Sequence, residues 1–479
     1  MSRDHYRGVP KTRDAIVRPD GTVEPLDKIR QDLGLGSGGA SGPVVQVGWT
    51  STTNIYARST GSDTSGSGTL ASPYRTLVRC LEDVPNITDG SDVFIDISSI
   101  GTETVLGPLR LPPVLGSRKR AVVTNGKTLR SDYRFARPFN IYAEPTVIQT
   151  FTVSSTASAT TSLRKSYTLT GAGWVPDEHK GRFVIGAGQF HTAIIVGNTE
   201  DTIVVSANLA FTGQLSIVEP SATLKCGYIS NPGGVLFAEA FTTGNVNVDL
   251  AITGVAFEHN ASGQSIRVYG GQDNFFELCS FDGVSMGGSE GIIKYNGCLF
   301  NGQVDWERST VDFDYCFFNN AVIPEFNAGN SAYGGCTLLG IGPLGSDPVY
   351  NRDRAHPNQH VENCTIVSGT GDGIVAFNVS RSFVGDTTID YCAGDAISAD
   401  RGANLVVRTV TGANNGGYGV LVNNAAQVEI RTGAVTGALG DFKVGTLLNP
   451  STWAGFVSAG GNMLDVNTVS GTLSRMFAV

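Results

Sequence analysis

The chain has 479 residues, a formal net charge of −9, 61 glycines and only 16% charged residues. An acidic chain repels phosphate backbones and anionic surfaces, so we expect no nucleic-acid partner. No apolar stretch approaches the roughly 20 residues that a membrane-spanning helix needs, which argues against membrane insertion. Many glycines and few charges favour short strands joined by turns, so we expect an all-β protein.

Residues 1–43 differ in composition from the rest of the chain. Of the first 33 residues, 13 are charged, so this segment cannot build a core of its own. Leu26, Ile29 and Leu33 are spaced like the apolar face of a short helix, and a glycine-rich linker follows at 34–42. This organisation predicts an arm that attaches the chain to a larger assembly, with a disordered leader as the alternative. No apolar segment follows the first residues, so we expect no secretory signal peptide.

The segment 44–120 is predicted to form a strand, a glycine-rich turn and a helix. We expect Ser72 to be the N-cap and Pro73 the first helical residue. The predicted apolar face of this helix consists of Tyr74, Leu77, Val78 and Leu81. Such a helix can cover the open end of a solenoid, where apolar side chains and strand edges would otherwise meet water.

The same segment carries a family resemblance. Tyr56, then Gly61-Ser62-Asp63, Gly68-Thr69 and Ser72-Pro73-Tyr74-Arg75-Thr76-Leu77 follow one another in the order seen at the entrance of pectin-lyase-like β-helix proteins. The chain therefore resembles the right-handed, single-stranded parallel β-helices of phage tail spikes and tail fibres. In these proteins a helix caps the first coil.

Residues 121–225 alternate apolar and polar side chains without a repeat. We expect three strands here, at 181–185, 193–196 and 202–205, joined by tight turns. The segment resembles a small β-module that is inserted into many phage β-helix proteins. We expect its role to be structural.

A repeat begins near residue 255 and makes 226–432 the predicted parallel β-helix. Its triplets recur at steps of 24, 19, 18, 20 and 28 residues, which is the spacing of solenoid coils. In each triplet the first and third residues are apolar and should face inward, while the middle residue should face outward. The triplets start at Val255, Cys279, Cys298, Cys316, Cys336 and Cys364.

The cysteines of the repeat should form an internal ladder of reduced, close-packed thiols. Single thiols stacked in this way do not converge as four tetrahedral ligands, which argues against a metal site. His356 and His360 are four residues apart, but Pro357 between them argues against the helix that a two-histidine zinc motif requires. We therefore expect no metal and no cofactor.

A second repeat contains Gly371-Asp372-Gly373-Ile374 and Gly394-Asp395-Ala396-Ile397, which are 23 residues apart. Asp372 and Asp395 should therefore lie side by side on neighbouring coils, at a separation suited to paired-acid glycoside cleavage. We take them as candidate catalytic residues. The alternative is that they are turn residues, because aspartate is common in such turns.

A polar loop enlarges the coil between Cys336 and Cys364, and loops that project from a rigid scaffold are where binding groups collect. Tyr350 could stack on a sugar ring, Arg352 and Arg354 could bind an acidic glycan, and Asp347 with Asp353 could accept hydrogen bonds from sugar hydroxyls. These are the candidate glycan-binding residues. A subunit contact or a solvated loop is the alternative.

Residues 433–479 are apolar enough to close the solenoid or to form a trimer contact. The resemblance implies a homotrimer in a virion, attached to other tail or baseplate proteins through residues 1–43, that contacts a host-surface glycan. A polysaccharide depolymerase, which would be a hydrolase or a lyase, is the second hypothesis. A purely structural baseplate or decoration protein is the third, since a fold alone does not define a function.

Overall fold

We describe a computed structural model of the chain, in two units that cover 1–49 and 50–479. The residues described are 15–17, 23–25, 53–84, 93–105, 109–110, 139–153, 155–158, 165–169, 171–186, 192–206, 213–226, 228–231, 250–259, 266–270, 273–287, 292–306, 310–322, 324–325, 331–334, 336–340, 344–346, 358–368, 371–376, 381–400, 403–423 and 426–444. In the first unit, β1 (Ala15–Val17) pairs antiparallel with β2 (Val23–Pro25). The helix predicted around Leu26 and Leu33 lies outside the described residues.

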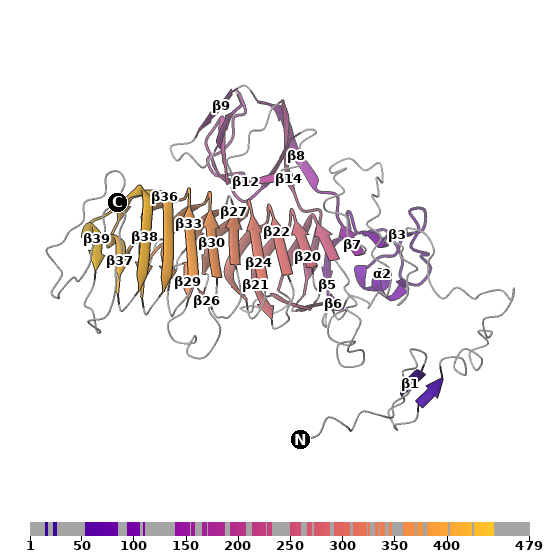
Figure 1. Ribbon diagram of the computed structural model, residues 1–479. Helices are drawn as coiled ribbons and strands as arrows, with labels where there is room; N and C mark the ends of the chain where they lie inside the picture. Colours follow the sequence, from indigo (N-terminus) through magenta and orange to yellow (C-terminus); the bar gives the residue numbers. More distant parts are fainter. Residues whose placement is uncertain are drawn as a thin grey trace, which may run out of the picture. The chain divides into compact units, whose positions relative to one another are not determined.

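The second unit is a parallel β-helix whose strands form three faces (Figure 1). Strands of the first face pair in parallel, each with its equivalent in the next coil. In order they are β3 (Thr53–Tyr56), β4 (Val93–Asp96), β7 (Phe139–Tyr142), β17 (Leu250–Thr253), β20 (Asp273–Glu277), β22 (Ile292–Asn296), β24 (Thr310–Asp314), β27 (Ser331–Gly334), β30 (Asn358–Glu362), β33 (Arg381–Gly385), β36 (Asn404–Asn415) and β38 (Gln427–Gly437).

The other two faces follow the same rule of parallel pairing. The second face consists of β5 (Gly101–Thr104), β15 (Ala222–Lys225), β18 (Val255–Glu258), β21 (Ser280–Gly287), β23 (Leu299–Trp306), β25 (Phe317–Val322), β28 (Thr337–Gly340), β31 (Thr365–Ser368) and β34 (Thr388–Asp390). The third face has β6 (Leu109–Arg110), β16 (Tyr228–Asn231) and β19 (Ile266–Gly270), then the ends of β21 and β23. It continues with β26 (Pro324–Glu325), β29 (Leu344–Ser346), β32 (Ile374–Ala376), β35 (Ile397–Ala399), β37 (Tyr418–Val422) and β39 (Gly440–Val444).

The β-helix extends beyond the boundaries predicted for it. Strand β39 pairs with β37, so the coils continue past residue 432 to Val444. Strands β7 and β15, at the two edges of the predicted module 121–225, pair with β-helix strands on both sides. The alternation of the sequence did not reveal this, because a module strand and a coil strand bury side chains with the same period of two. Residues 445–479 lie outside the described residues.

The first residue of each repeat triplet faces inward, as predicted. Cys279, Cys298, Cys316, Cys336 and Cys364 are buried, and each thiol lies within hydrogen-bonding distance of the carbonyl two residues earlier. Burial raises the pKa of the Cys279, Cys316 and Cys364 thiols well above its usual range, which keeps them neutral. All eight cysteines are free and buried, as expected for a structural ladder.

The third triplet position, which was expected to face inward, forms an aromatic ladder. Phe257, Phe281, Phe300 and Phe318 stack in succession with ring centroids 4.8–5.3 Å apart. A second ladder on the first face lies beside it and was not predicted; it consists of Phe276, Tyr295, Phe313 and Tyr333, with ring centroids 5.0–5.3 Å apart. Rings of the two ladders meet edge to face, as Phe281 and Tyr295 do at 88°, so the core is fixed by geometry as well as by burial.

The capping helix starts later than predicted. Helix α2 (Leu77–Asp83) has Thr76 as its N-cap, whose side chain accepts a hydrogen bond from the Arg79 N–H. The predicted cap, Ser72, was wrong because Tyr74 instead forms a β-bridge with Ala57, which keeps this stretch extended. Leu77 and Leu81 are buried, but Val78 is 36% exposed. No helix among the described residues is long and apolar enough to cross a membrane.

The inserted module is a seven-stranded antiparallel sheet, in the order β8, β14, β11, β12, β13, β10, β9. Its strands are β8 (Thr146–Thr152), β9 (Ser155–Ser158), β10 (Lys165–Thr168), β11 (Phe183–Gly186), β12 (Thr192–Asn198), β13 (Thr202–Val205) and β14 (Gln214–Glu219). The three predicted strands correspond to β11, β12 and β13. The outermost strands β8 and β9 follow one another in the chain, and Figure 1 shows the sheet curled round on itself.

The module packs on the second face of the β-helix. Phe183, Ile194 and Val218 contact a cluster that contains Leu278, Leu299 and Phe317 of the coils. Thr337 Oγ1 also donates a hydrogen bond to the Ser206 carbonyl at 2.7 Å. Leu299, Phe317 and Thr337 are the middle residues of their triplets, so they do face out of the coil, but the module buries them.

Candidate functional site

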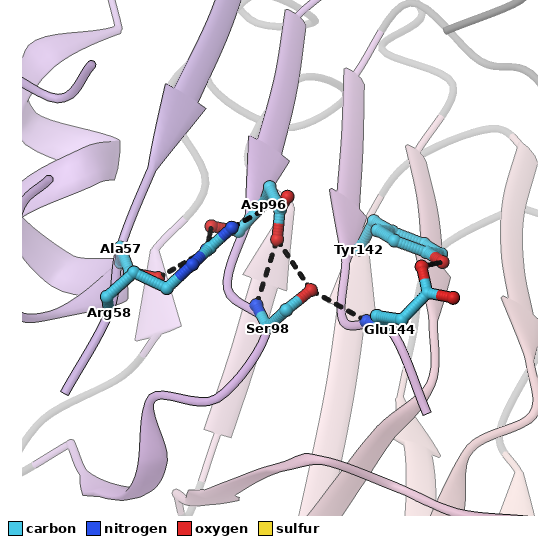
Figure 2. Close-up of polar contacts among 6 residues, drawn as sticks. All are labelled: Ala57, Arg58, Asp96, Ser98, Tyr142 and Glu144. Carbon is cyan, nitrogen blue, oxygen red and sulfur yellow. Dashed lines mark hydrogen bonds and ion pairs between the residues drawn. The ribbon is translucent and has the colours of Figure 1, made fainter. Parts of the chain in front are cut away.

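A polar network joins the first three coils (Figure 2). Arg58 forms an ion pair with Asp96 at 3.0 Å and also donates to the Ala57 and Asp96 carbonyls. The other Asp96 oxygen accepts from both the N–H and the hydroxyl of Ser98, at 3.0 and 2.6 Å. Ser98 Oγ accepts from the Glu144 N–H at 2.8 Å. Figure 2 shows these groups pointing at one another across neighbouring strands.

The charged side chains of Arg58 and Asp96 are paired and hydrogen-bonded with each other. Burial alone would raise the pKa of Asp96, but the hydrogen bonds from Arg58 and Ser98 outweigh it and lower the pKa below its usual value. The Tyr142 hydroxyl in turn donates to Glu144. Arg58 donates and Asp96 accepts hydrogen bonds within the protein. We therefore interpret this network as a structural connection between the entrance coils.

Asp372 and Asp395 occupy equivalent positions on neighbouring coils, as expected. Asp372 Oδ1 accepts a hydrogen bond from the Asp395 N–H at 2.7 Å, and Asp395 Oδ1 accepts one from the Tyr418 N–H at 2.6 Å. Each carboxylate thus binds the backbone of the next coil. Asp395 is only 9% exposed, and burial raises the pKa of Asp372.

This geometry supports the turn-residue alternative for both aspartates. A Cβ on Gly394 would lie 2.1 Å from Asp372 Oδ1, and a Cβ on Gly417 would lie 2.2 Å from Asp395 Oδ1. The absence of a side chain at Gly394 and Gly417 therefore leaves room for each carboxylate to contact the backbone of the next coil. A catalytic role for the pair stays a prediction.

The predicted glycan-binding residues Asp347, Tyr350, Arg352, Asp353 and Arg354 lie outside the described residues, as does His356. Their role stays a prediction. His360 is described on β30, where it lies 3.3 Å from Glu362 and stacks on Phe383. In the part of the chain that the structure describes, no group of three or more potential metal ligands comes together.

The structure reveals a set of carboxylates that the sequence analysis missed. We call Asp312, Asp314 and Glu362 the acidic row. Asp312 and Asp314 are two residues apart on β24, and the residues that alternate with them, Val311 and Phe313, are fully buried. Both acids therefore lie on the outside of the first face. Asp314 pairs in register with Gly334, which pairs with Glu362 on the following coil.

Asp314 is the most perturbed carboxylate of the row. It keeps an exposed surface, yet burial of the carboxylate by the surrounding protein, assisted by the negative charge of Asp312, raises its pKa to about 6. Lys294, on the preceding coil, acts in the opposite direction. Titratable groups with raised pKa values and exposed surface often mark functional sites.

A glycine gives Asp314 its position. A Cβ on Gly334 would lie 2.7 Å from Asp314 Oδ1, so the carboxylate leans over the backbone of the next coil. Beyond it, the side chains of His360 and Glu362 are 52% and 40% exposed. Carboxylates, an imidazole and the half-buried Phe383 ring thus lie on β24, β30 and β33 of the same sheet.

The sequence did contain a signal for this row. Within Val311-Asp312-Phe313-Asp314 apolar and acidic residues alternate, and the period of two of a strand then points Val311 and Phe313 inward and both aspartates outward. The facing of the triplet does not carry over to this strand, because Tyr315 between them has a positive φ and breaks the alternation.

Comparisons with known proteins agree with this fold. Residues 345–440 match a family described as a right-handed β-helix region. No curated protein matches the chain. The fold is therefore a right-handed parallel β-helix, as predicted, with an inserted β-module and an N-terminal helix.

Several solved structures are similar at low identity. A glycoside hydrolase is 10% identical with a TM-score of 0.26, over 86% of this chain and 94% of the other. The Gp54 tailspike of Acinetobacter baumannii bacteriophage AP22, in complex with capsular saccharide, is 10% identical with a TM-score of 0.20, over 77% of this chain and 63% of the other. The tailspike gp61 of Pseudomonas phage phi297 is 9% identical with a TM-score of 0.19, over 78% and 60%.

Proposed function

We propose that this chain is a tail-spike-like component of a phage-like particle that binds a host-surface polysaccharide on the first face of its β-helix. The observation that carries the proposal is the acidic row, which presents exposed carboxylates on β24 and β30, two coils apart on one sheet and in register through Gly334. Carboxylates accept hydrogen bonds from sugar hydroxyls, and charged acceptors form the stronger bonds. The entrance motif around Ser72-Pro73-Tyr74 supports the phage-like assignment by resemblance.

The charge of the row favours a neutral polysaccharide over an acidic one. Asp312, Asp314 and Glu362 add to a chain whose net charge is already −9, and like charges repel at close range. We propose further that the protein is a homotrimer, that it is located in a virion, and that residues 1–43 attach it to other tail or baseplate proteins. These assignments follow the resemblance of the entrance segment.

Two measurements test the proposal. Mass photometry of the purified chain should give a trimer, and biolayer interferometry against a panel of bacterial capsule and lipopolysaccharide glycans should identify a ligand. Asp314→Asn and Glu362→Gln should each weaken that binding by about tenfold or more, because each removes a charged acceptor. Glu258→Gln is the matched control, since Glu258 is an exposed carboxylate on the second face, paired with Lys225.

The outcomes separate the alternatives. A trimer that binds no glycan would favour a purely structural part. Binding that survives both variants would remove the acidic row from the site and leave the loop around Tyr350 and Arg352 as the candidate.

Glycoside hydrolysis is the second candidate function, and Asp314 is the specific observation that favours it. Hydrolysis needs one protonated acid to donate a proton to the glycosidic oxygen and one carboxylate to act on water or on the sugar. A carboxyl whose pKa is about 6, beside a second carboxylate on the same strand, meets the first requirement. Release of reducing ends by the wild type, lost in Asp314→Asn, would establish this activity.

A further inference from the structure

The inserted module contains a histidine that is buried in its neutral form. His179 lies in the turn 176–181, which precedes β11, and it is only 2% exposed. Arg182 Nη1 donates a hydrogen bond to His179 Nδ1 at 2.6 Å. Because a guanidinium group has no acceptor, Nδ1 carries no proton, and the imidazole is neutral with its proton on Nε2. His179 Nε2 is buried as well, and it forms no hydrogen bond within the described residues.

Other contacts hold the His179 ring against Arg182. The imidazole meets the Trp174 ring edge to face, with ring centroids 4.8 Å apart, and Trp174 belongs to the buried core of the module. The His179 backbone N–H donates to the Asn198 side chain at 2.8 Å, and Asn198 Nδ2 donates to the Val175 carbonyl at 2.9 Å. The ring therefore has little freedom to move away from the guanidinium group.

The charges around the ring oppose its protonation. Burial, and then the positive charge of Arg182, lower the pKa of His179, whereas the negative charge of Glu178 acts in the opposite direction. Glu178 is exposed, and Asp177 accepts a hydrogen bond from a backbone N–H of β12. On β14, Glu219 lies 3.7 Å from Arg182 Nε. The remaining charged residues of the turn and of the connection between β12 and β13 are exposed or half-buried: Lys180, Glu200 and Asp201.

The same turn touches the coils of the β-helix. A Cβ on Gly181 would lie 3.5 Å from the Leu299 side chain on the second face. Phe183 packs in the cluster that contains Leu299 and Phe317 of the coils. Arg182 lies between these two contact residues in the chain. A displacement of Arg182 is therefore transmitted directly to the contact between the module and the coils.

We propose that His179 makes the attachment of the module to the coils sensitive to acid. When the ring takes up a proton from solvent, Nδ1 loses the hydrogen bond from Arg182, and two cations then lie side by side. The turn moves to separate them, the module leaves the second face, and Leu299 and Phe317 become exposed to water. Acid sensitivity of this kind does not require that the protein bind a glycan.

The direction of the pH dependence follows from the neutral ring. The attached state disfavours the protonated form, so the attachment is fully stable above the ordinary pKa of histidine, 6.5, and weakens as the pH falls below it. The population of the detached form should then grow by up to about tenfold for each pH unit, because one proton is taken up on detachment.

Hydroxyl-radical footprinting of the full-length chain, read by mass spectrometry, tests this movement between pH 7 and pH 5. Oxidation of Phe317 should rise as the pH falls, by up to about tenfold per pH unit. Oxidation of Phe300, which is buried inside the coils, should stay low and serves as the internal reference. Unchanged oxidation of Phe317 would overturn the proposal. So would a parallel rise at Phe300, because the coils themselves would then be opening.

Three variants identify the group that titrates. His179→Asn keeps an acceptor for Arg182 but takes up no proton, so oxidation of Phe317 should be the same at every pH, whether its level is low or high. Arg182→Gln keeps a donor without the charge, and it should make the rise smaller. His360→Gln is the matched control, since His360 is 52% exposed on the first face, and it should respond like the wild type.

The variants also define the results that would contradict the proposal. A rise that persists in His179→Asn would assign the titration to another group. A full rise in Arg182→Gln would mean that repulsion from Arg182 does not drive the movement. Loss of the rise in His360→Gln would place the acid-sensitive group on the first face and not in the module.

Discussion

The Asp372 carboxylate accepts a hydrogen bond from the backbone N–H of Asp395 at 2.7 Å, so each of these aspartates serves the coil that follows it. We expect Asp372→Ala to lower the free energy of unfolding by about 1–2 kcal/mol, because a half-buried N–H loses its acceptor. Thermal and denaturant unfolding measure this change. Asp372→Asn, which keeps a side-chain oxygen, should lose less. Unchanged stability with loss of sugar-end release would instead establish the catalytic prediction for this residue.

The cysteine ladder should be chemically inert in the folded protein. All eight thiols are buried, so a reagent in solution cannot reach the sulfur atoms without local opening of the coils. A thiol-specific reagent such as Ellman's reagent should therefore label none of the native cysteines in the time in which it labels all of them in denaturant. Rapid labelling of one native thiol would show that its coil opens, and mass spectrometry of the labelled peptide would identify it.

The contact between module and coils should contribute strongly to stability. Phe317 is fully buried beneath the module, and we expect Phe317→Ala to lower the free energy of unfolding by about 3–5 kcal/mol. Ser280 has the same triplet position but is only half-buried, so Ser280→Ala is the matched control and should have little effect. Limited proteolysis provides a second measurement, because a loosened module should be cleaved faster. Equal stability of the two variants would mean that the module contact adds little.

Asp314 should make stability depend on pH in a defined window. Its pKa is about 6 in the folded chain and 3.8 as the ordinary value, so folding disfavours the ionised form. The resulting loss of stability is absent below the ordinary value, grows as the pH rises towards 6, and is complete above it. Asp314→Asn should therefore raise the melting temperature at pH 7 and lose that advantage at pH 4. A difference that is the same at both pH values would contradict the raised pKa.

Gly334 gives a direct way to move Asp314 without removing its charge. A Cβ at this position would approach Asp314 Oδ1 to 2.7 Å, and the end of a side chain can shift at little cost. We expect Gly334→Ala to leave the melting temperature nearly unchanged and to weaken glycan binding as Asp314→Asn does. Full binding by Gly334→Ala, with binding lost in Asp314→Asn, would mean that the charge of Asp314 matters but its position does not.

Most of the fold could be predicted from local pattern. The spacing of Cys279, Cys298 and Cys316 gives the coil length, and the alternation within each triplet gives the inward side chains, because both depend only on the geometry of a strand. The N-cap was misplaced from Thr76 to Ser72 because the bridge between Tyr74 and Ala57 is a contact between separate segments. Local capping preferences contain no information about such a pairing.

The candidate site divides in the same way. By itself the sequence determined the β-helix, the cysteine ladder and the neighbouring positions of Asp372 and Asp395. When coils stack in register, residues at equivalent positions of the sequence repeat lie above one another. Only the tertiary structure decided that these two carboxylates bind the next coil's backbone, that Leu299 and Phe317 are buried by the module, and that Asp314 is exposed where Asn296 is covered. The physical reason is that a repeat fixes which way a side chain points, whereas the groups that it contacts belong to other coils or to a module that is distant in the sequence.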